Sequence, residues 1–127
     1  MSFEIINPEP LGRPSGWNNG LLGPAGGRVL FVAGQTAPDL AGLVAQWERA
    51  LERVLAVVQA ARGTPQDIGR MTVYVTDKAA YLAGRPALGA VHRRLMGKHY
   101  PAMALVEVKA LVDPGALVEI EATAVIP

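Results

Sequence analysis

The sequence predicts an α+β fold in which one sheet carries two helices on a single face. Segments 39–62 and 79–96 have apolar residues at spacings of three and four, which is typical of amphipathic helices. Other segments are rich in β-branched residues or alternate apolar with polar ones, as strands do. The expected order is three strands, a helix, a strand, a helix and two strands, which favours a two-layer sandwich.

Length and composition favour one intracellular domain. A chain of 127 residues has the usual size of a domain, so we expect a single domain over 1–127. The absence of cysteine excludes disulfides and thiolate ligands and favours the cytoplasm. No signal peptide and no apolar run long enough for a membrane span is visible, so a cytoplasmic protein without a membrane partner is expected.

Charge and hydrophobicity indicate the partners. Twelve Lys and Arg against eleven Asp and Glu give a net charge of +1, and the basic residues are scattered. Nucleic-acid binding, which needs a concentrated basic surface, is therefore disfavoured. Hydrophobic residues make up 50% of the chain and charged residues 18%, which indicates that another copy of the chain covers apolar surface.

Short strands and loops are expected before the first helix. Segment 3–6 predicts an edge strand, and 11–19 predicts a loop with the isolated Trp17. Segments 20–23 and 28–36 predict a strand pair, linked by a proline- and glycine-containing turn.

The first helix, 39–62, is expected to end at Gly63. A new turn follows, with Thr64 as its cap and Pro65 at the first helical position. The next segment, 70–76, is a dense β-branched and aromatic run that suits a strand buried on both faces.

The second helix, 79–96, has Asp77 as its expected cap. Pro86 lies within this segment, so the helix either begins near Arg85 or is kinked at the proline.

The last segment, 100–126, predicts two long strands joined by a turn at 112–115. In the final strand one face consists of core residues, namely Val118, Ile120, Ala122 and Ala124. The other face carries Glu119 and Glu121, and a carboxylate removed from water needs partners. This second face is therefore wet, or it is a site or a subunit contact.

Few residues point to chemistry without further comparison. His92 and His99 have no carboxylate at metal-ligand spacing, so exposed histidines and no metal site are expected. Trp17 suits either a ligand wall or a packing anchor, and Arg85 either a surface charge or an anion clamp. Glu119 suits either a subunit contact or a catalytic role.

Four segments together resemble the RidA (YjgF) family. They read VLFVAGQT at 29–36, TVYVTD at 72–77, YPAM at 100–103 and VEIEA at 118–122, and the resemblance extends from about 14 to 126. It implies a chorismate-mutase-like fold, assembled as a homotrimer around a central barrel with three clefts between subunits. Active members hydrolyse reactive enamines and imines, such as those formed from 2-aminoacrylate, to 2-keto acids and ammonia without a cofactor. Older descriptions of the family include endoribonuclease L-PSP and translation inhibitor.

Part of the family's site is retained. Glu119 matches the acid associated with the attacking water, and Gly34 and Gln35 match the glycine and glutamine after the second strand. Trp17 falls near a tyrosine that lines the cleft, so it keeps an aromatic wall without the hydroxyl.

Three positions depart from the family's pattern. Met103 occupies the position of an arginine that grips the substrate carboxylate, Ala33 that of a serine, and Leu105 that of a cysteine found in some members. Methionine cannot pair with a carboxylate, and losing such a buried pair typically weakens binding by about 2 to 5 kcal/mol.

These departures predict a divergent member with a more apolar cleft and no cofactor. We expect a hydrolase for an enamine- or imine-type or related small molecule that lacks a carboxylate, with Glu119 handling the water. The alternative is a non-catalytic trimer that binds or senses a small ligand. Arg85 is the residue expected to supply a charge from a new direction.

Overall fold

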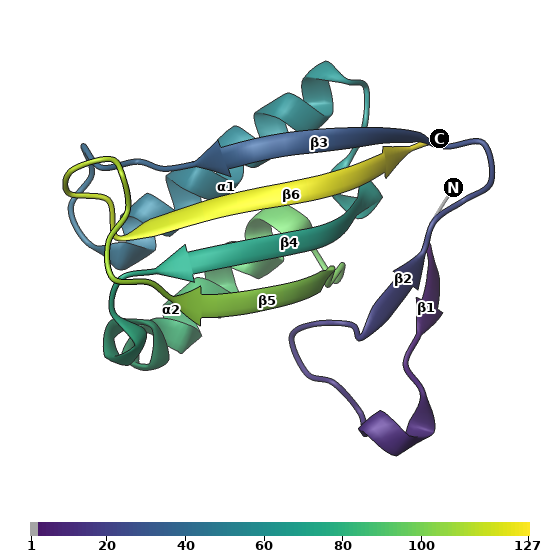
Figure 1. Cartoon of the computed structure of the whole chain (residues 1–127), viewed down its shortest axis with the longest axis horizontal. Coiled ribbons are helices and arrows are strands. Elements are labelled where there is room, and N and C mark those ends of the chain that lie inside the picture. The colour runs from purple at the N-terminus through teal and green to yellow at the C-terminus, as the bar shows by residue number, and fades with distance from the viewer. Residues whose placement is uncertain (1–2) are drawn as a thin grey trace.

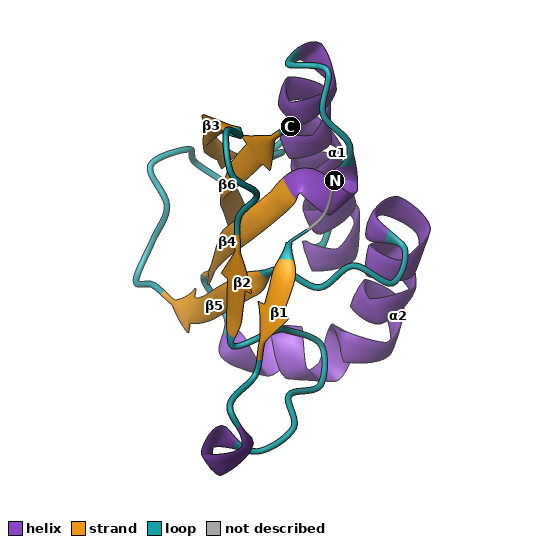
Figure 2. Ribbon diagram, turned by 90° about the vertical axis from the view of Figure 1, so that its right-hand side faces the viewer, coloured by secondary structure: helices purple, strands orange, loops and turns teal. Residues whose placement is uncertain are grey.

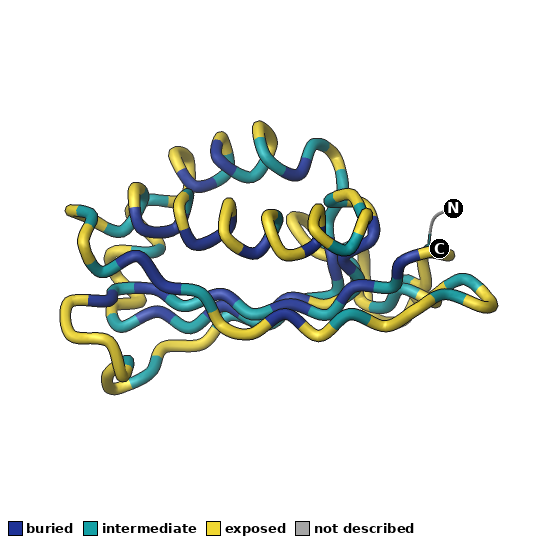
Figure 3. The backbone as a smooth tube through the Cα atoms, turned by 90° about the horizontal axis from the view of Figure 1, so that it is seen from above, coloured by how far each residue is buried: buried dark blue, intermediate teal, exposed yellow. Residues whose placement is uncertain are grey.

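The computed structural model describes residues 3–127 and has the expected two-layer α+β arrangement. Helices α1 (Leu43–Ala60) and α2 (Lys78–Met96) cover one face of a four-stranded sheet, and within the described residues no helix covers the other face (Figures 1 and 3). The strands are β3 (Arg28–Gln35), β4 (Ile68–Val75), β5 (Ala102–Glu107) and β6 (Val118–Ile126), in the order β3-β6-β4-β5. The sheet is mixed, because β6 is antiparallel to β3 and β4 while β5 is parallel to β4.

A separate two-stranded sheet precedes the main one (Figure 2). It pairs β1 (Glu4–Ile6) with β2 (Gly20–Leu22), so the prediction that 20–23 pairs with 28–36 is wrong. Asn7 closes this hairpin, since its Nδ2 donates to Asn18 Oδ1 at 2.8 Å and its Oδ1 accepts from Asn19 N at 2.7 Å. A short 3₁₀ helix, Glu9–Leu11, lies between the two strands.

The turn between β5 and β6 does not make a hairpin. A turn is present, because Ala116 N donates to Asp113 O at 3.1 Å and Gly115 has a φ of 83°. However, β4 lies between β5 and β6, so the expectation of two directly joined long strands is only partly met. Strand β5 is also short, and it pairs in parallel with β4 because the α2 crossover returns the chain to the same end of the sheet.

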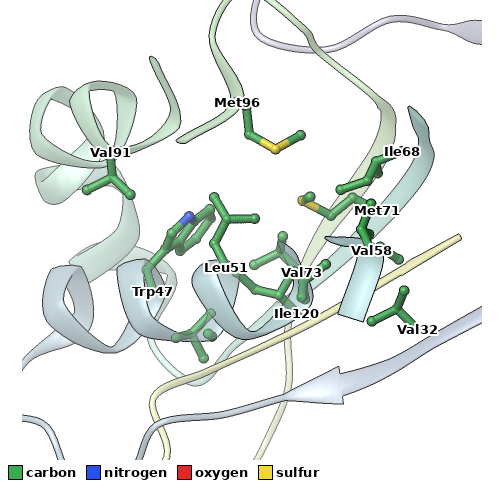
Figure 4. Packing of buried hydrophobic residues seen from close by; sticks show 14 of the residues in the cluster. Val32, Trp47, Leu51, Val58, Ile68, Met71, Val73, Val91, Met96 and Ile120 are labelled. Carbon is green, nitrogen blue, oxygen red and sulfur yellow. The ribbon is translucent and has the colours of Figure 1, made fainter. Parts of the chain in front are cut away.

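The core lies between the helices and one face of the sheet (Figure 4). The α1 stripe buries Trp47, Leu51, Val54 and Val58, as the sequence predicts. In β6 the residues expected in the core are all buried, whereas the other face is half-exposed. In β4 burial also alternates, so the prediction of a strand buried on both faces is wrong for the single chain, because helices cover only one face.

The end of α1 and the turn after it follow the sequence signals closely. The helix ends at Ala60. Just after it, Arg62 takes a φ of 65° and Gly63 N donates to Val58 O at 2.9 Å. A 3₁₀ helix, Pro65–Asp67, then follows Thr64, whose N–H donates to Asp67 Oδ2 at 2.7 Å.

The helix starts are less closely predicted. Helix α1 begins at Leu43 rather than at 39, after Gly42 with a φ of 86°. Asp77 does cap α2, accepting from Ala80 N at 3.1 Å, and the helix continues through Pro86.

The uncovered sheet face is apolar at its edges. Phe31 and Val29 on β3 are 79% and 56% exposed, and Val106 on β5 is 43% exposed. Between them lie the half-exposed carboxylate residues Glu119 and Glu121 of β6. Within residues 3–127, no helix combines the length and hydropathy required for a membrane crossing.

Candidate functional site

A cavity of about 460 Å³ lies on the helix side of the sheet, between α2, β5 and the loop before β2. Four residues singled out from the sequence line it: Trp17, Arg85, Met103 and Leu105. Its volume is within the usual range for small-molecule pockets. A larger and more open hollow near the end of β6, about 700 Å³, contains none of the expected site residues.

Strand β5 directs Met103 and Leu105 into this cavity. In the parallel pairing, Met103 lies beside Met71 and Leu105 beside Val73, and both β4 residues are buried under the helices. Because aligned residues of neighbouring strands point to the same face, Met103 and Leu105 also face the helices. In the sequence, Met103, Leu105, Glu107 and Lys109 share the mixed apolar and charged side of the expected strand. No local pattern showed that this side faces the helices.

The loop before β2 is hydrogen-bonded to the start of β5. Asn18 N donates to Pro101 O at 3.1 Å, and its Nδ2 donates to Tyr100 O at 2.7 Å. Trp17, next to this anchor, lines the cavity and remains 44% exposed. Its indole Nε1 donates to Asn19 Oδ1 at 3.3 Å, so the ring is oriented within its own loop.

Helix α2 forms the opposite wall. Tyr81, Arg85, Gly89 and His92 all line the cavity and follow one another at spacings of three and four, hence on one helix face. Glu107 fixes the start of this helix against β5, because its Oε1 accepts from Lys78 N at 2.8 Å.

Aromatic residues that the sequence analysis did not assign to the site also line the cavity. Trp47 and Tyr81 stack with centroids 5.8 Å apart, and His92 and Tyr100 stack at 4.7 Å. The periodic stripe of α1 identified Trp47 as a core residue. No local pattern in the sequence showed that these four rings meet.

The expectation of exposed histidines is wrong, because both histidines are half-buried and hydrogen-bonded to the backbone. His92 Nε2 lies 2.8 Å from His99 O, and His99 Nε2 lies 2.6 Å from Ile68 O. Because a carbonyl only accepts, each Nε2 carries the proton. Burial is the main cause that lowers the pKa of His92, so this imidazole is neutral near pH 7.

Glu119 lies on the other face of the sheet. Its neighbours Val118 and Ile120 are completely buried under the helices, so the Glu119 side chain points away from them. Gly34 lies against it, and Ala33 is exposed beside Gly34. Within residues 3–127 Glu119 has no ion pair or hydrogen bond of its side chain.

Tyr74 is the cross-strand neighbour of Glu119 on this face. Its hydroxyl donates to Glu121 Oε1 at 2.6 Å, and this hydrogen bond is the main cause that raises the pKa of Tyr74. Glu121 is therefore engaged within the sheet, whereas Glu119 is available to a ligand or a second chain.

A single chain thus separates the expected site into two groups. Trp17, Arg85, Met103 and Leu105 line the helix-side cavity, while Glu119, Ala33 and Gly34 lie on the uncovered sheet face. Within one chain, the sheet therefore lies between the two groups. Among the described residues, no three His, Asp or Glu side chains are arranged to hold a metal ion.

Comparisons with known proteins agree on one family. Residues 17–126 match the family model described as Endoribonuclease L-PSP. The crystal structure of YyfB from Yersinia pestis, a Rid-family protein of unknown function, is 31% identical, covers 99% of this chain and 100% of that chain, and has a TM-score of 0.83.

Two further solved structures show similar relationships. A member of the YjgF/YER057c/UK114 family from Mycobacterium tuberculosis is 35% identical over 87% of each chain, with a TM-score of 0.65. RidA from the Antarctic bacterium Psychrobacter is 27% identical, covering 91% of this chain and 92% of that chain, with a TM-score of 0.67. No curated protein matches this chain.

Proposed function

The chain belongs to the Rid/YjgF (endoribonuclease L-PSP) family, and from this membership we propose that it hydrolyses an enamine- or imine-type small molecule bound between subunits. The observation that carries the proposal is the separation of the site residues between two sheet faces. The cavity supplies walls for a ligand, and Glu119 supplies an unpaired carboxylate on the opposite face.

A homotrimer with the uncovered sheet faces around a central barrel is the proposed assembly. It would remove Phe31, Val29 and Val106 from water, which removes an energetic cost of the single chain. It would also place the Glu119 side of one subunit near the cavity of the next. Trimerisation and ligand binding are therefore linked in this proposal.

The proposed reaction needs one acid–base group and one water molecule. Glu119 accepts a proton as the water oxygen attacks the carbon of the C=N bond. Glu119 returns this proton to nitrogen, which gives a carbinolamine. Glu119 then moves the hydroxyl proton to the same nitrogen as the C–N bond breaks and the C=O bond forms, so the products are a carbonyl compound and ammonia. No electron transfer occurs, so the reaction needs neither an oxidant nor a reductant.

Met103 restricts what the ligand presents to β5. A thioether offers no charge and no strong donor, so the group next to Met103 is apolar or uncharged. A ligand that lacks a carboxylate therefore stays the prediction, and it is supported by Met103 and Leu105, both of which line the cavity.

A non-catalytic ligand-binding trimer is the second candidate. Two observations favour it. The helix-side cavity is formed without Glu119, and the side chain of Ala33 has no polar group that could stabilise a transition state. Ligand binding that survives Glu119→Gln with no measurable turnover would support this candidate over the hydrolase.

The first experiment measures ammonia and keto-acid release from freshly generated 2-iminopropionate, with mass in solution checked for every variant. Glu119→Gln should abolish any turnover seen in the wild type. Activity only in Met103→Arg would show that the scaffold is competent and that the wild type acts on another ligand. The proposal would be contradicted if the wild type and the Met103→Arg variant both formed trimers, both showed no turnover, and neither bound any small imine or ketone.

A further inference from the structure

The hollow of about 700 Å³ at the end of β6 is bordered by two arginines from different elements. Arg28 begins β3, and Arg62 follows the end of α1 by two residues, at the same end of the sheet (Figure 1). No residue that lines this hollow also lines the helix-side cavity, so the hollow is separate from the proposed intersubunit site. Neither arginine belongs to either of the two ion pairs formed within residues 3–127.

Strand β3 turns Arg28 toward the helix side of the sheet. Leu30 and Val32, at alternate positions on the same strand, belong to the core or pack against it, so Arg28 shares their face. The residue opposite Arg28 on β6 is Ile126, which is buried. Because Arg28 is itself exposed at the start of the strand, it stands at the rim of the core, where Arg62 also borders the hollow.

Arg62 occupies a position that normally belongs to glycine. Its φ of 65° lies in the left-handed region, and it is the only non-glycine residue among residues 3–127 with a positive φ. Helices that end in this way usually have glycine there, because a side chain is strained in this conformation. The next residue is glycine for another reason, since a Cβ on Gly63 would lie 2.4 Å from Ile126 Cδ1. The contact with β6 explains Gly63, but it does not explain an arginine at 62.

Stabilisation of the helix end does not account for this arginine either. A cation near the C-terminus of a helix is favourable, and it gains this stabilisation anywhere in the last turn. The last turn of α1 has no basic residue, although Gln59 and Ala60 have ordinary helical positions that tolerate one. The charge is instead carried at the left-handed position, which favours a function for the Arg62 side chain in the hollow.

The other polar groups of the hollow leave its positive charge in excess. The one carboxylate side chain of the lining, Asp67, is 6% exposed and accepts from Thr64 N at 2.7 Å, so it is engaged in the turn after α1. Gln66 is exposed and adds an amide that can donate to an anion. Two guanidinium groups and an amide donor therefore surround one open hollow.

This donor set suits a phosphate dianion. A phosphate monoester carries a charge of about −1.5 to −2 at pH 7 and presents three strong acceptor oxygens. Guanidinium groups pair with phosphate oxygens through two parallel hydrogen bonds, so two arginines match the charge and the oxygens of one such group. A nucleic-acid backbone fits less well, because its phosphates are monoanions and the other basic residues of the chain are scattered.

We propose that the hollow at the end of β6 binds a phosphate dianion, free or as the monoester of a small molecule. Arg28 and Arg62 hold the phosphate oxygens, and Gln66 is a further donor. The hollow is open, so the rest of a monoester extends toward solvent. The strain at Arg62 is then explained as a cost in stability that is retained for binding.

The test is an NMR titration of the full chain at pH 7.5 and constant ionic strength, followed at the backbone amides of residues 62–66. Three probes are compared: inorganic phosphate, methyl phosphate and dimethyl phosphate. The two dianions should bind at least about tenfold more tightly than the diester monoanion, and added salt should weaken them. Inorganic phosphate bound at least about tenfold more tightly than methyl phosphate would identify free phosphate as the ligand, whereas similar affinities would identify a monoester.

Arg62→Gly separates binding from folding. It removes the guanidinium and relieves the left-handed strain, so methyl phosphate should bind at least about tenfold more weakly while the urea midpoint does not fall. Arg28→Gln should weaken binding by a similar factor, and Arg62→Lys should retain part of it. Arg93→Gln is the matched control, because Arg93 is an exposed arginine in the last turn of α2 that does not line the hollow. It should leave binding unchanged.

Four results would overturn the inference. They are equal affinity for methyl and dimethyl phosphate, no saturable shift at residues 62–66, normal binding by Arg62→Gly, and an equal loss of binding in Arg93→Gln. None of these measurements involves an imine or Glu119, so their outcome is independent of whether the chain is a hydrolase.

Discussion

Gly34 lies directly against the carboxylate of Glu119: a Cβ on Gly34 would be 2.7 Å from Oε2 and 2.8 Å from Cδ of that side chain. The register of β3 and β6 shifts between Val32 and Gln35, and this irregularity brings Gly34 beside Glu119. The position of Glu119, the candidate acid of the site, therefore depends on the absence of one methyl group.

Gly34→Ala should displace the Glu119 side chain with little effect on folding. The side chain can change rotamer on a half-exposed face, so the free energy of unfolding should change by less than about 1 kcal/mol. Glu119-dependent turnover should fall by about 10- to 100-fold, because catalysis is sensitive to small misplacements. Denaturant unfolding and the imine assay measure the two effects.

Gly84→Ala is the control for this substitution. A Cβ at Gly84 meets only ordinary contacts, the nearest being Leu88 Cδ1 at 3.7 Å, and Gly84 does not line the cavity. Alanine there should stabilise α2 by up to about 1 kcal/mol and leave turnover unchanged. If Gly34→Ala retained full turnover, the placement of Glu119 by Gly34 would not matter for function.

Gln46 is a buried amide that joins α1 to two loops. Its Nε2 donates to Leu40 O at 2.9 Å and to Gly115 O at 3.1 Å, and its Oε1 accepts from Leu117 N at 2.8 Å. Gln46→Ala removes all three bonds and should lower the free energy of unfolding by about 2 to 4 kcal/mol. Urea denaturation monitored by circular dichroism measures the loss.

Gln59→Ala provides the comparison on the same helix. Gln59 is exposed, so its replacement should change the stability by no more than about 0.5 kcal/mol. Similar losses for both variants would show that helix propensity, and not the hydrogen bonds of Gln46, accounts for the effect.

His92 should make the folded state sensitive to mild acid. Its pKa is lowered in the folded state, mainly by burial, so the unfolded chain binds the proton more readily. This contribution to stability is complete above about pH 6.5 and is lost as the pH falls through the folded pKa. Proton NMR should show His92 titrating below the usual range.

His92→Gln should reduce this acid sensitivity. Denaturant midpoints measured from pH 7.5 to 5 should fall less steeply for the variant than for the wild type. Parallel curves would indicate that His92 does not control the pH dependence, even if its own titration is shifted.

Phe31 should control assembly rather than folding. It is 79% exposed on the uncovered sheet face, so Phe31→Asp removes no buried contact of the single chain. In the proposed trimer it would bury a charge, and the assembly should dissociate to monomers. Analytical ultracentrifugation with circular dichroism distinguishes dissociation from unfolding.

Val112→Asp is the matched control for a new surface carboxylate. Val112 is 96% exposed in the loop between β5 and β6, outside the sheet face. Its replacement should leave the mass in solution unchanged. A trimer that tolerates Phe31→Asp as well would place the subunit contact elsewhere.

The sequence by itself determined most of the elements and the core faces of α1 and β6, because these depend on neighbours within one turn or one strand. The alternation of 118–124 and the periodic stripe of α1 identified buried residues correctly. The predicted capping positions of Asp77 and Thr64 were also confirmed. Family membership also followed from local segments. The single domain, the cytoplasmic location and the trimer remain predictions.

Only the tertiary structure decided which strands pair and which side chains meet. The pairing of β2 with β1 and of β5 with β4 depends on segments far apart in the chain, so local periodicity could not specify it. The same pairing turns Met103 toward the helices and leaves Glu119 on the opposite face. Arg85 and His92 became site residues because helix packing, a long-range property, brought one face of α2 to the edge of β5.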